Sequence, residues 1–169
     1  PRLPEQMWEL NRFADTFLLG SDQVLHPNSV EYTKKSFLLN FVEDSKKKIA
    51  FSSSFGHEED PNRPEERGEM GRLLRRFDHI GLREESGVQI MKKNYGVNNA
   101  TVVMDAIFLS EKELYEQIAS ESNKNETEPF IATYILDPNP EIKKALLHVS
   151  EKLGCKLINL LDGAAFSFD

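Results

Sequence analysis

Cysteine and long apolar runs are the scarcest features of this 169-residue sequence. Cys155 is the only cysteine, so no disulfide can form within the chain, which is typical of a reducing, cytoplasmic compartment. The longest apolar stretches, such as residues 17–19 and 130–136, fall far short of the ~18 residues of a membrane span. No secretory signal pattern opens the sequence. We therefore expect a cytoplasmic protein without a transmembrane segment.

Positive charge is also in short supply. The sequence has 21 Lys and Arg against 28 Asp and Glu, a net charge of −7. A protein that binds nucleic acid or anionic lipid needs a basic face, so we expect neither as a partner. The Cys, His and carboxylate residues show no metal-ligand spacing, and no glycine-rich dinucleotide or P-loop motif occurs. We expect neither a metal nor a cofactor.

Apolar residues are sufficient for a globular core, since 39% of the chain is hydrophobic and 11 residues are Phe. Residues 121–128 (ESNKNETE) contain no apolar side chain and are typical of a linker. We predict a Rossmann-like domain over residues 1–120 and the incomplete start of a second α/β domain over residues 129–169. Because the sequence opens on Pro1, we expect a piece of a longer protein.

Strand and helix patterns alternate along the whole chain. Short apolar runs predict strands at residues 16–20, 48–53, 79–83, 101–104, 130–136 and 156–160. Helical spacing and capping residues predict helices at residues 65–77, 84–95, 110–120 and 139–153, while residues 26–28 have turn chemistry. Asn139 is the expected N-cap of the last helix, and Gly96 and Gly154 are expected at helix ends. This order indicates an α/β fold in which helices flank parallel sheets.

Polar residues follow each of the first four predicted strands. These segments are Gly20-Ser21-Asp22, Ser54-Phe55-Gly56, Arg83 and Asp105. The carboxyl ends of parallel strands share one edge, where open α/β folds bind their ligands. The sequence therefore predicts a crevice lined by small hydroxyl residues, glycines, one arginine and two carboxylates.

Four segments resemble motifs of the polysaccharide pyruvyl transferase family, in family order. They are FLLGSDQV at residues 17–24, SSFG at 53–56, FDHIGLREESG at 77–87 and VVMDA at 102–106. The resemblance covers residues 15–109. It implies a two-domain fold similar to GT-B glycosyltransferases, with the active cleft between the domains. It also implies that the family's catalytic histidine belongs to a later segment, so we expect this chain alone to be inactive.

The family reaction moves a pyruvyl group from phosphoenolpyruvate to sugar hydroxyls of a polysaccharide or lipid-linked glycan. A donor with a carboxylate and a phosphate suits an arginine fork. Arg83 is the candidate anion clamp, and the alternative is an ion pair with Asp22, Glu84 or Asp105. Asp22 is the candidate general base or sugar ligand, and the alternative is a turn cap through its side-chain oxygen. Asp105 either positions a ligand or ends its strand as a turn residue.

Five further residues are substrate-binding candidates. Ser21, Gln23 and Ser54 can contact a ligand, although loop serines also serve local backbone bonds. Gly20 and Gly56 are expected to satisfy the backbone geometry while allowing a ligand close to the main chain.

Histidines and arginines near these motifs carry weaker signals. His26 and His57 are candidate proton donors, although exposed loop histidines are the favoured interpretation. His79 is expected in the core or on the sheet surface. A local arginine cluster is expected to form a solvated helix face paired with Glu65, Glu66 and Glu69. Its members are Arg63, Arg67, Arg72, Arg75 and Arg76.

Two other functions stay open at this point. A GT-B glycosyltransferase that uses a nucleotide sugar would share the architecture. A catalytically silent α/β binding module is the third hypothesis, because Leu25 and Ala106 replace a tryptophan and a proline of the family pattern. Residues 129–169 are too few to close a sheet alone, so they require the first domain or a second chain, as in a homo-oligomer.

Overall fold

The computed structural model describes residues 4–33, 35–121 and 127–161. The chain divides into two compact units, Pro1–Lys112 and Glu113–Asp169. The centre of the predicted linker, residues 122–126, lies outside the described residues. The predicted domain boundaries and the GT-B-like pairing of domains stay predictions.

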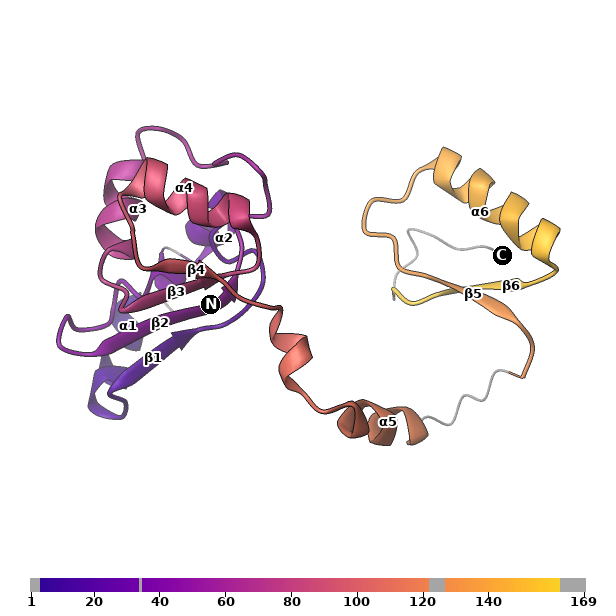
Figure 1. Ribbon diagram of the computed structural model, residues 1–169, viewed down its shortest axis with the longest axis horizontal. Helices are drawn as coiled ribbons and strands as arrows, with labels where there is room; N and C mark the ends of the chain where they lie inside the picture. Colours follow the sequence, from indigo (N-terminus) through magenta and orange to yellow (C-terminus); the bar gives the residue numbers. More distant parts are fainter. Residues whose placement is uncertain (1–3, 34, 122–126, 162–169) are drawn as a thin grey trace. The chain divides into compact units, whose positions relative to one another are not determined.

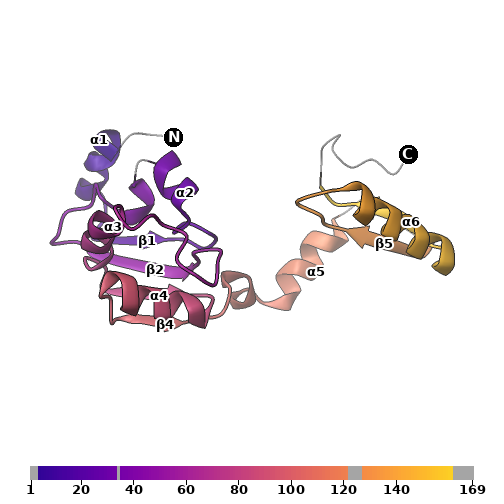
Figure 2. The ribbon, with the colours of Figure 1, turned by 90° about the horizontal axis from the view of Figure 1, so that it is seen from above.

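The first unit is an α/β layer built on a four-stranded parallel sheet (Figures 1 and 2). The strand order is β1-β2-β3-β4, so each strand pairs with the next one along the chain. The strands are β1 (Thr16–Leu19), β2 (Lys47–Ser53), β3 (His79–Leu82) and β4 (Ala100–Val102). This sheet and its helices confirm the predicted Rossmann-like α/β class.

Short and medium helices precede, connect and follow these strands. They are α1 (Pro4–Met7), η1 (Trp8–Arg12), α2 (Pro27–Tyr32), η2 (Ser36–Leu38), α3 (Arg67–Leu74), α4 (Glu85–Tyr95) and η3 (Ala106–Leu109). Figure 1 shows α3 and α4 side by side over one face of the sheet. Gly96 ends α4 in the left-handed conformation (φ 65°), as its position in the sequence predicts.

The core lies on one face of the sheet. Leu19, Ala50 and Ile80 are register neighbours in adjacent strands, and all three are buried beneath helix residues such as Leu73 and Met91. Leu18 points to the opposite face and is exposed. Strand residues alternate between the two faces, so the second face of this sheet is only partly covered.

One predicted turn is the start of a helix. Residues 26–28 open α2, where the His26 side chain accepts a hydrogen bond from the Asn28 N–H (3.2 Å). Val30 and Leu38 of α2 and η2 are buried in the core, so tertiary packing stabilises helices that the sequence pattern missed.

The second unit contains a single β-α-β motif. Its strands β5 (Phe130–Thr133) and β6 (Lys156–Asn159) are parallel and are connected by α6 (Pro140–Leu153). The Asn139 side chain caps α6 by accepting from the Ile142 N–H (2.9 Å), and Gly154 ends it at φ 62°, as predicted. Helix α5 (Lys112–Ser120) comes before β5. No helix among the described residues is long and apolar enough to span a membrane.

Candidate active site

The segments after β1, β2 and β3 are joined by main-chain hydrogen bonds at the carboxyl edge of the first sheet. Asp22 forms a parallel bridge with Ser53, and the Ser54 N–H donates to the Asp22 carbonyl (3.0 Å). The Arg83 N–H donates to the Ser53 carbonyl (3.0 Å). The convergence of strand ends predicted from the sequence is therefore present.

A β-bulge in β2 brings the segment after β4 into the same edge. The pairing of β2 with β3 shifts between Ala50 and Ser53, and Ser52 lies inside this irregularity with a φ of 57°. The buried Ser52 hydroxyl accepts from the Ala106 N–H (3.1 Å), and the Ser53 hydroxyl donates to the Gly20 carbonyl (3.3 Å). Sequence reasoning assigned no role to these two serines, although Ser53 belongs to the SSFG segment at 53–56 and both belong to the run of three serines at 52–54.

Arg83 is the central charged group of this edge. Its Nη1 lies 2.9 Å from Asp105 Oδ2, and its Nη2 lies 3.6 Å from Asp22 Oδ1. Its Nε is shielded from solvent, lies 3.7 Å from Glu84 Oε1 and makes no hydrogen bond within the described residues. The ion-pair alternative for Arg83 is thus present, and one guanidinium N–H is left without an acceptor.

Asp105 both ends its strand segment and holds Arg83. Its carboxylate accepts from Arg83 and from the Ile107 N–H (3.2 Å), which starts η3. These hydrogen bonds, first the one from Arg83 and then the one from Ile107, lower the pKa of Asp105 below its ordinary value. Asp105 is therefore an anion that fixes the arginine fork.

Asp22 presents a carboxylate to solvent from a constrained backbone. Its φ is 86°, a region that non-glycine residues rarely adopt, and its side chain is 82% exposed. The turn after β1 is held by the Asp22 carbonyl, which accepts from the Val24 N–H (2.8 Å). The main-chain oxygen thus fills the role that the cap alternative gave to the side chain, and the carboxylate stays accessible.

The five other candidates separate into exposed and structural groups. Ser21 and Gln23 are exposed beside Asp22. The buried Ser54 hydroxyl accepts from the Gly56 N–H (2.8 Å), so Ser54 serves the local backbone. Gly56 has a φ of 76°, and a Cβ there would lie 2.7 Å from the Gln23 side chain. Gly20 differs from the expectation, because its φ is not left-handed and a Cβ added to it would meet nothing within 4 Å.

Comparison with known proteins assigns the chain to a family. A family model described as polysaccharide pyruvyl transferase matches residues 3–165 of the 169. The chain belongs to the polysaccharide pyruvyl transferase family. No curated protein and no solved structure matches the chain significantly. The match extends well beyond residues 15–109, where the motif resemblance lies, and the family indicates a transferase with a glycan acceptor.

The histidines of this pyruvyl transferase family member occupy two kinds of position. The rings of His26 and His57 stack with centroids 5.3 Å apart, which connects the loops after β1 and β2. The His26 Nδ1 atom is already an acceptor for the Asn28 N–H. His79 is exposed on the sheet surface, where its Nε2 lies 2.9 Å from Thr101 Oγ1.

The arginine cluster of this family member is not paired as predicted. Arg67 pairs with Asp60 (2.9 Å), and Arg76 pairs with Asp44 (2.6 Å). Arg75 donates to the Tyr95 carbonyl (2.7 Å). These arginines reach loops and α4 instead of glutamates on their own helix, so they hold α3 in place. Among the described residues, no group of three or more His, Cys, Asp or Glu is arranged to hold a metal ion.

Proposed function

We propose that this protein transfers a pyruvyl group from phosphoenolpyruvate to two hydroxyls of a glycan, forming a ketal and releasing phosphate. The observation that carries this proposal is the Arg83 guanidinium at the carboxyl edge of the sheet, whose Nε–H finds no hydrogen-bond acceptor in the part of the chain that the structure describes. A shielded N–H of a cation is a strong donor for a carboxylate oxygen. Family membership supports the same reaction.

The reaction needs one proton at the donor and two proton acceptors. The donor methylene takes up a proton and becomes a methyl group while one sugar oxygen bonds to the neighbouring carbon. A second sugar oxygen then bonds to that carbon as its bond to the phosphate oxygen breaks. One hydroxyl proton balances the new methyl group, and the other leaves with phosphate. The exposed carboxylate of Asp22 is the base that we assign to a sugar hydroxyl.

The carboxylates around Arg83 limit which part of the donor its guanidinium can bind. Three carboxylates, Asp22, Glu84 and Asp105, lie within 4 Å of its guanidinium. They leave no surplus positive charge for a whole phosphoenolpyruvate anion. We therefore assign Arg83 to the donor carboxylate alone, which would replace the long and exposed contact with Asp22. The phosphate needs positive charge from outside this edge.

We assign the contacts with the glycan acceptor to the solvent-exposed side chains after β1. Ser21, Asp22 and Gln23 present a hydroxyl, a carboxylate and an amide to solvent after β1. These groups donate to and accept from sugar hydroxyls without a change of charge. The open space at Gly20 allows a sugar ring close to the main chain.

Calorimetric titration of the full-length protein with phosphoenolpyruvate, and separately with uridine diphosphate sugars, tests the proposal. We expect saturable binding of phosphoenolpyruvate only. Arg83→Ala should weaken this binding at least tenfold, while Arg63→Ala, which removes an exposed arginine that takes no part in the ion pairs around Arg83, should leave it unchanged.

The other outcomes contradict the proposal in different ways. Binding of the nucleotide sugar alone would indicate a glycosyltransferase. Binding of neither ligand by the folded full-length protein would indicate a module without transfer activity. Unchanged affinity in Arg83→Ala would remove Arg83 from the donor site.

A further inference from the structure

A second concave surface lies at the amino ends of the strands, away from the candidate active site. It is a groove of about 460 Å³ that precedes β1, β2 and β3 in the chain, and its lining is more polar than apolar. The residues that line it include Trp8, Glu43, Asp44, Arg72 and Arg76. We propose that this groove is a saccharide-binding site, separate from the site of transfer.

Trp8 gives the groove an aromatic surface. It is the only tryptophan of the chain, and 53% of it is exposed although tryptophan is usually well buried. A pyranose ring has an apolar face of C–H groups, which packs against an indole ring, and a rim of hydroxyls that needs polar partners. An exposed tryptophan beside charged side chains supplies both requirements.

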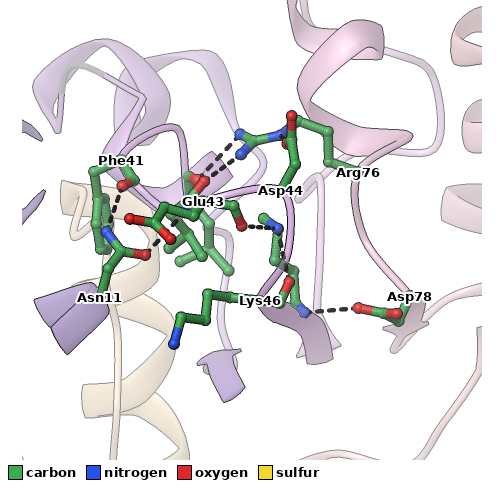
Figure 3. A network of polar contacts seen from close by, with 10 residues as sticks. Asn11, Phe41, Glu43, Asp44, Lys46, Arg76 and Asp78 are labelled. Atoms are coloured by element: carbon green, nitrogen blue, oxygen red, sulfur yellow. Dashed lines mark hydrogen bonds and ion pairs between the residues drawn. The ribbon is translucent and has the colours of Figure 1, made fainter. Parts of the chain in front are cut away.

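The main chain that carries the groove residues Val42, Glu43 and Asp44 is held by a network of polar contacts (Figure 3). The Asn11 side chain donates to the Phe41 carbonyl (3.0 Å) and accepts from the Glu43 N–H (2.9 Å). The buried Lys48 ammonium donates to the Glu43 carbonyl (2.6 Å), and Arg76 donates to Asp44 (2.6 Å). The main chain of residues 41–44 is therefore fixed before any ligand arrives, which lowers the entropy lost on binding.

The charges of the groove favour a neutral ligand. Arg76 pairs with Asp44, which leaves the half-buried Glu43 and the exposed Arg72 as hydrogen-bonding side chains of opposite charge. Carboxylates accept from neighbouring hydroxyls, and guanidinium groups donate to them. A phosphate-bearing ligand would meet the carboxylates of Glu43, Asp44 and Glu69. We therefore assign the groove to a neutral oligosaccharide.

This inference goes beyond the proposed transfer reaction and does not depend on the donor. A glycan held in the groove would leave Arg83 and Asp22 free, because these residues follow strands whose amino ends border the groove. The site would raise the time that a long acceptor spends on the protein.

The single tryptophan is a spectroscopic reporter for the test. We would titrate the 169-residue chain with cellohexaose and with chitohexaose and follow tryptophan emission. The expected result is a saturable shift to shorter wavelength with at least one of them. Phosphoenolpyruvate and the Arg83→Ala substitution should not change the affinity of the groove for the hexasaccharides. The test of the groove is therefore independent of the test of the donor site.

Variants identify the contact. By calorimetry, Trp8→Ala should weaken binding at least tenfold, Arg72→Ala about threefold, and Trp8→Phe less than Trp8→Ala because it keeps an aromatic plane. Phe13→Ala is the matched control, since Phe13 is an exposed aromatic of the same segment that does not line the groove. If Trp8→Ala fails to fold by circular dichroism, Arg72→Ala and Trp8→Phe decide the question.

Three results would overturn the inference. The first is no emission change with either hexasaccharide. The second is full affinity in Arg72→Ala together with Trp8→Ala or Trp8→Phe. The third is an emission change with uridine monophosphate in place of the saccharides, which would make the groove a nucleotide site.

Discussion

The two ends of the first sheet carry the same type of ion pair in different settings. At the carboxyl end Arg83 holds Asp105 (2.9 Å), and at the amino end Arg76 holds Asp44 (2.6 Å). The other N–H groups of Arg76 donate to the Leu39 and Val42 carbonyls, whereas the Nε–H of Arg83 has no acceptor among the described residues. A guanidinium whose three nitrogens all have acceptors stabilises the fold, and one that keeps an N–H without an acceptor is available to a ligand.

The strongest test of this contrast is Lys48→Met at the amino end. Lys48 is 1% exposed, and its ammonium donates to the Glu43 and Lys46 carbonyls (2.6 and 2.8 Å). Without it, two partly buried carbonyls lose a donor and the buried site loses its ammonium group, so the free energy of unfolding should fall by roughly 2–4 kcal/mol. Urea denaturation measures the change. Lys47→Met, at the exposed neighbouring position, should change it by less than about 0.5 kcal/mol. Equal effects of the two variants would contradict the amino-end network.

Gly56→Ala tests how much the backbone geometry at the carboxyl end of the sheet contributes to stability. The left-handed φ of 76° and the Gln23 side chain 2.7 Å from a Cβ should together lower stability by about 1–2 kcal/mol. Gly20→Ala is the control and should be nearly neutral, because nothing lies within 4 Å of its Cβ. Thermal unfolding of both variants, and of Gly56→Ala combined with Gln23→Ala, separates strain from contact. A double variant no better than the single one would assign the whole loss to the backbone.

Asp22→Gly should change the free energy of unfolding less than Gly56→Ala does, and should raise it instead of lowering it. Glycine adopts a φ of 86° without steric strain, so we expect stability to rise by up to about 1 kcal/mol while transfer to a glycan is lost. Urea denaturation and an assay of phosphate release from phosphoenolpyruvate, made on a form of the protein that is active, measure the two effects. A clear loss of stability would mean that the Asp22 carboxylate supports the fold.

The smallest expected effect concerns the acid dependence of stability. The hydrogen bond from Arg83 lowers the folded-state pKa of Asp105, so the stabilisation is present above the ordinary aspartate pKa and is lost as the pH falls through the lowered value. Arg83→Gln should raise the pKa of Asp105 in a carboxyl-carbon NMR titration. Arg63→Gln should not. An unchanged Asp105 titration in Arg83→Gln would contradict the ion pair.

Much of the fold can be predicted from the sequence because its signals are local. Gly96 and Gly154 mark helix ends, and Asn139 marks a helix start, since each acts within a few residues of itself. Helix α2 could not be predicted from local sequence signals. Its cap is a histidine, which is not a typical N-cap residue, and burial of Val30 stabilises it through contacts distant in sequence.

The residues that make up the candidate site can also be predicted from the sequence, but the ion pairs that they form cannot. The ends of parallel strands meet by topology, so Asp22, Arg83 and Asp105 are expected at one edge. Whether Arg83 is paired depends on side-chain placement across 22 residues of chain to Asp105. The same limit applies to Lys48, one of three consecutive lysines, of which only the structure identifies the buried one.

The simple order of the first sheet has a consequence for synthesis on the ribosome. Because β1, β2, β3 and β4 are neighbours in chain order, each strand that emerges finds its partner already made. No strand of this sheet has to wait for a distant segment or be inserted between two others. The described sheet can therefore grow in one direction during translation, with each new strand added at the same edge.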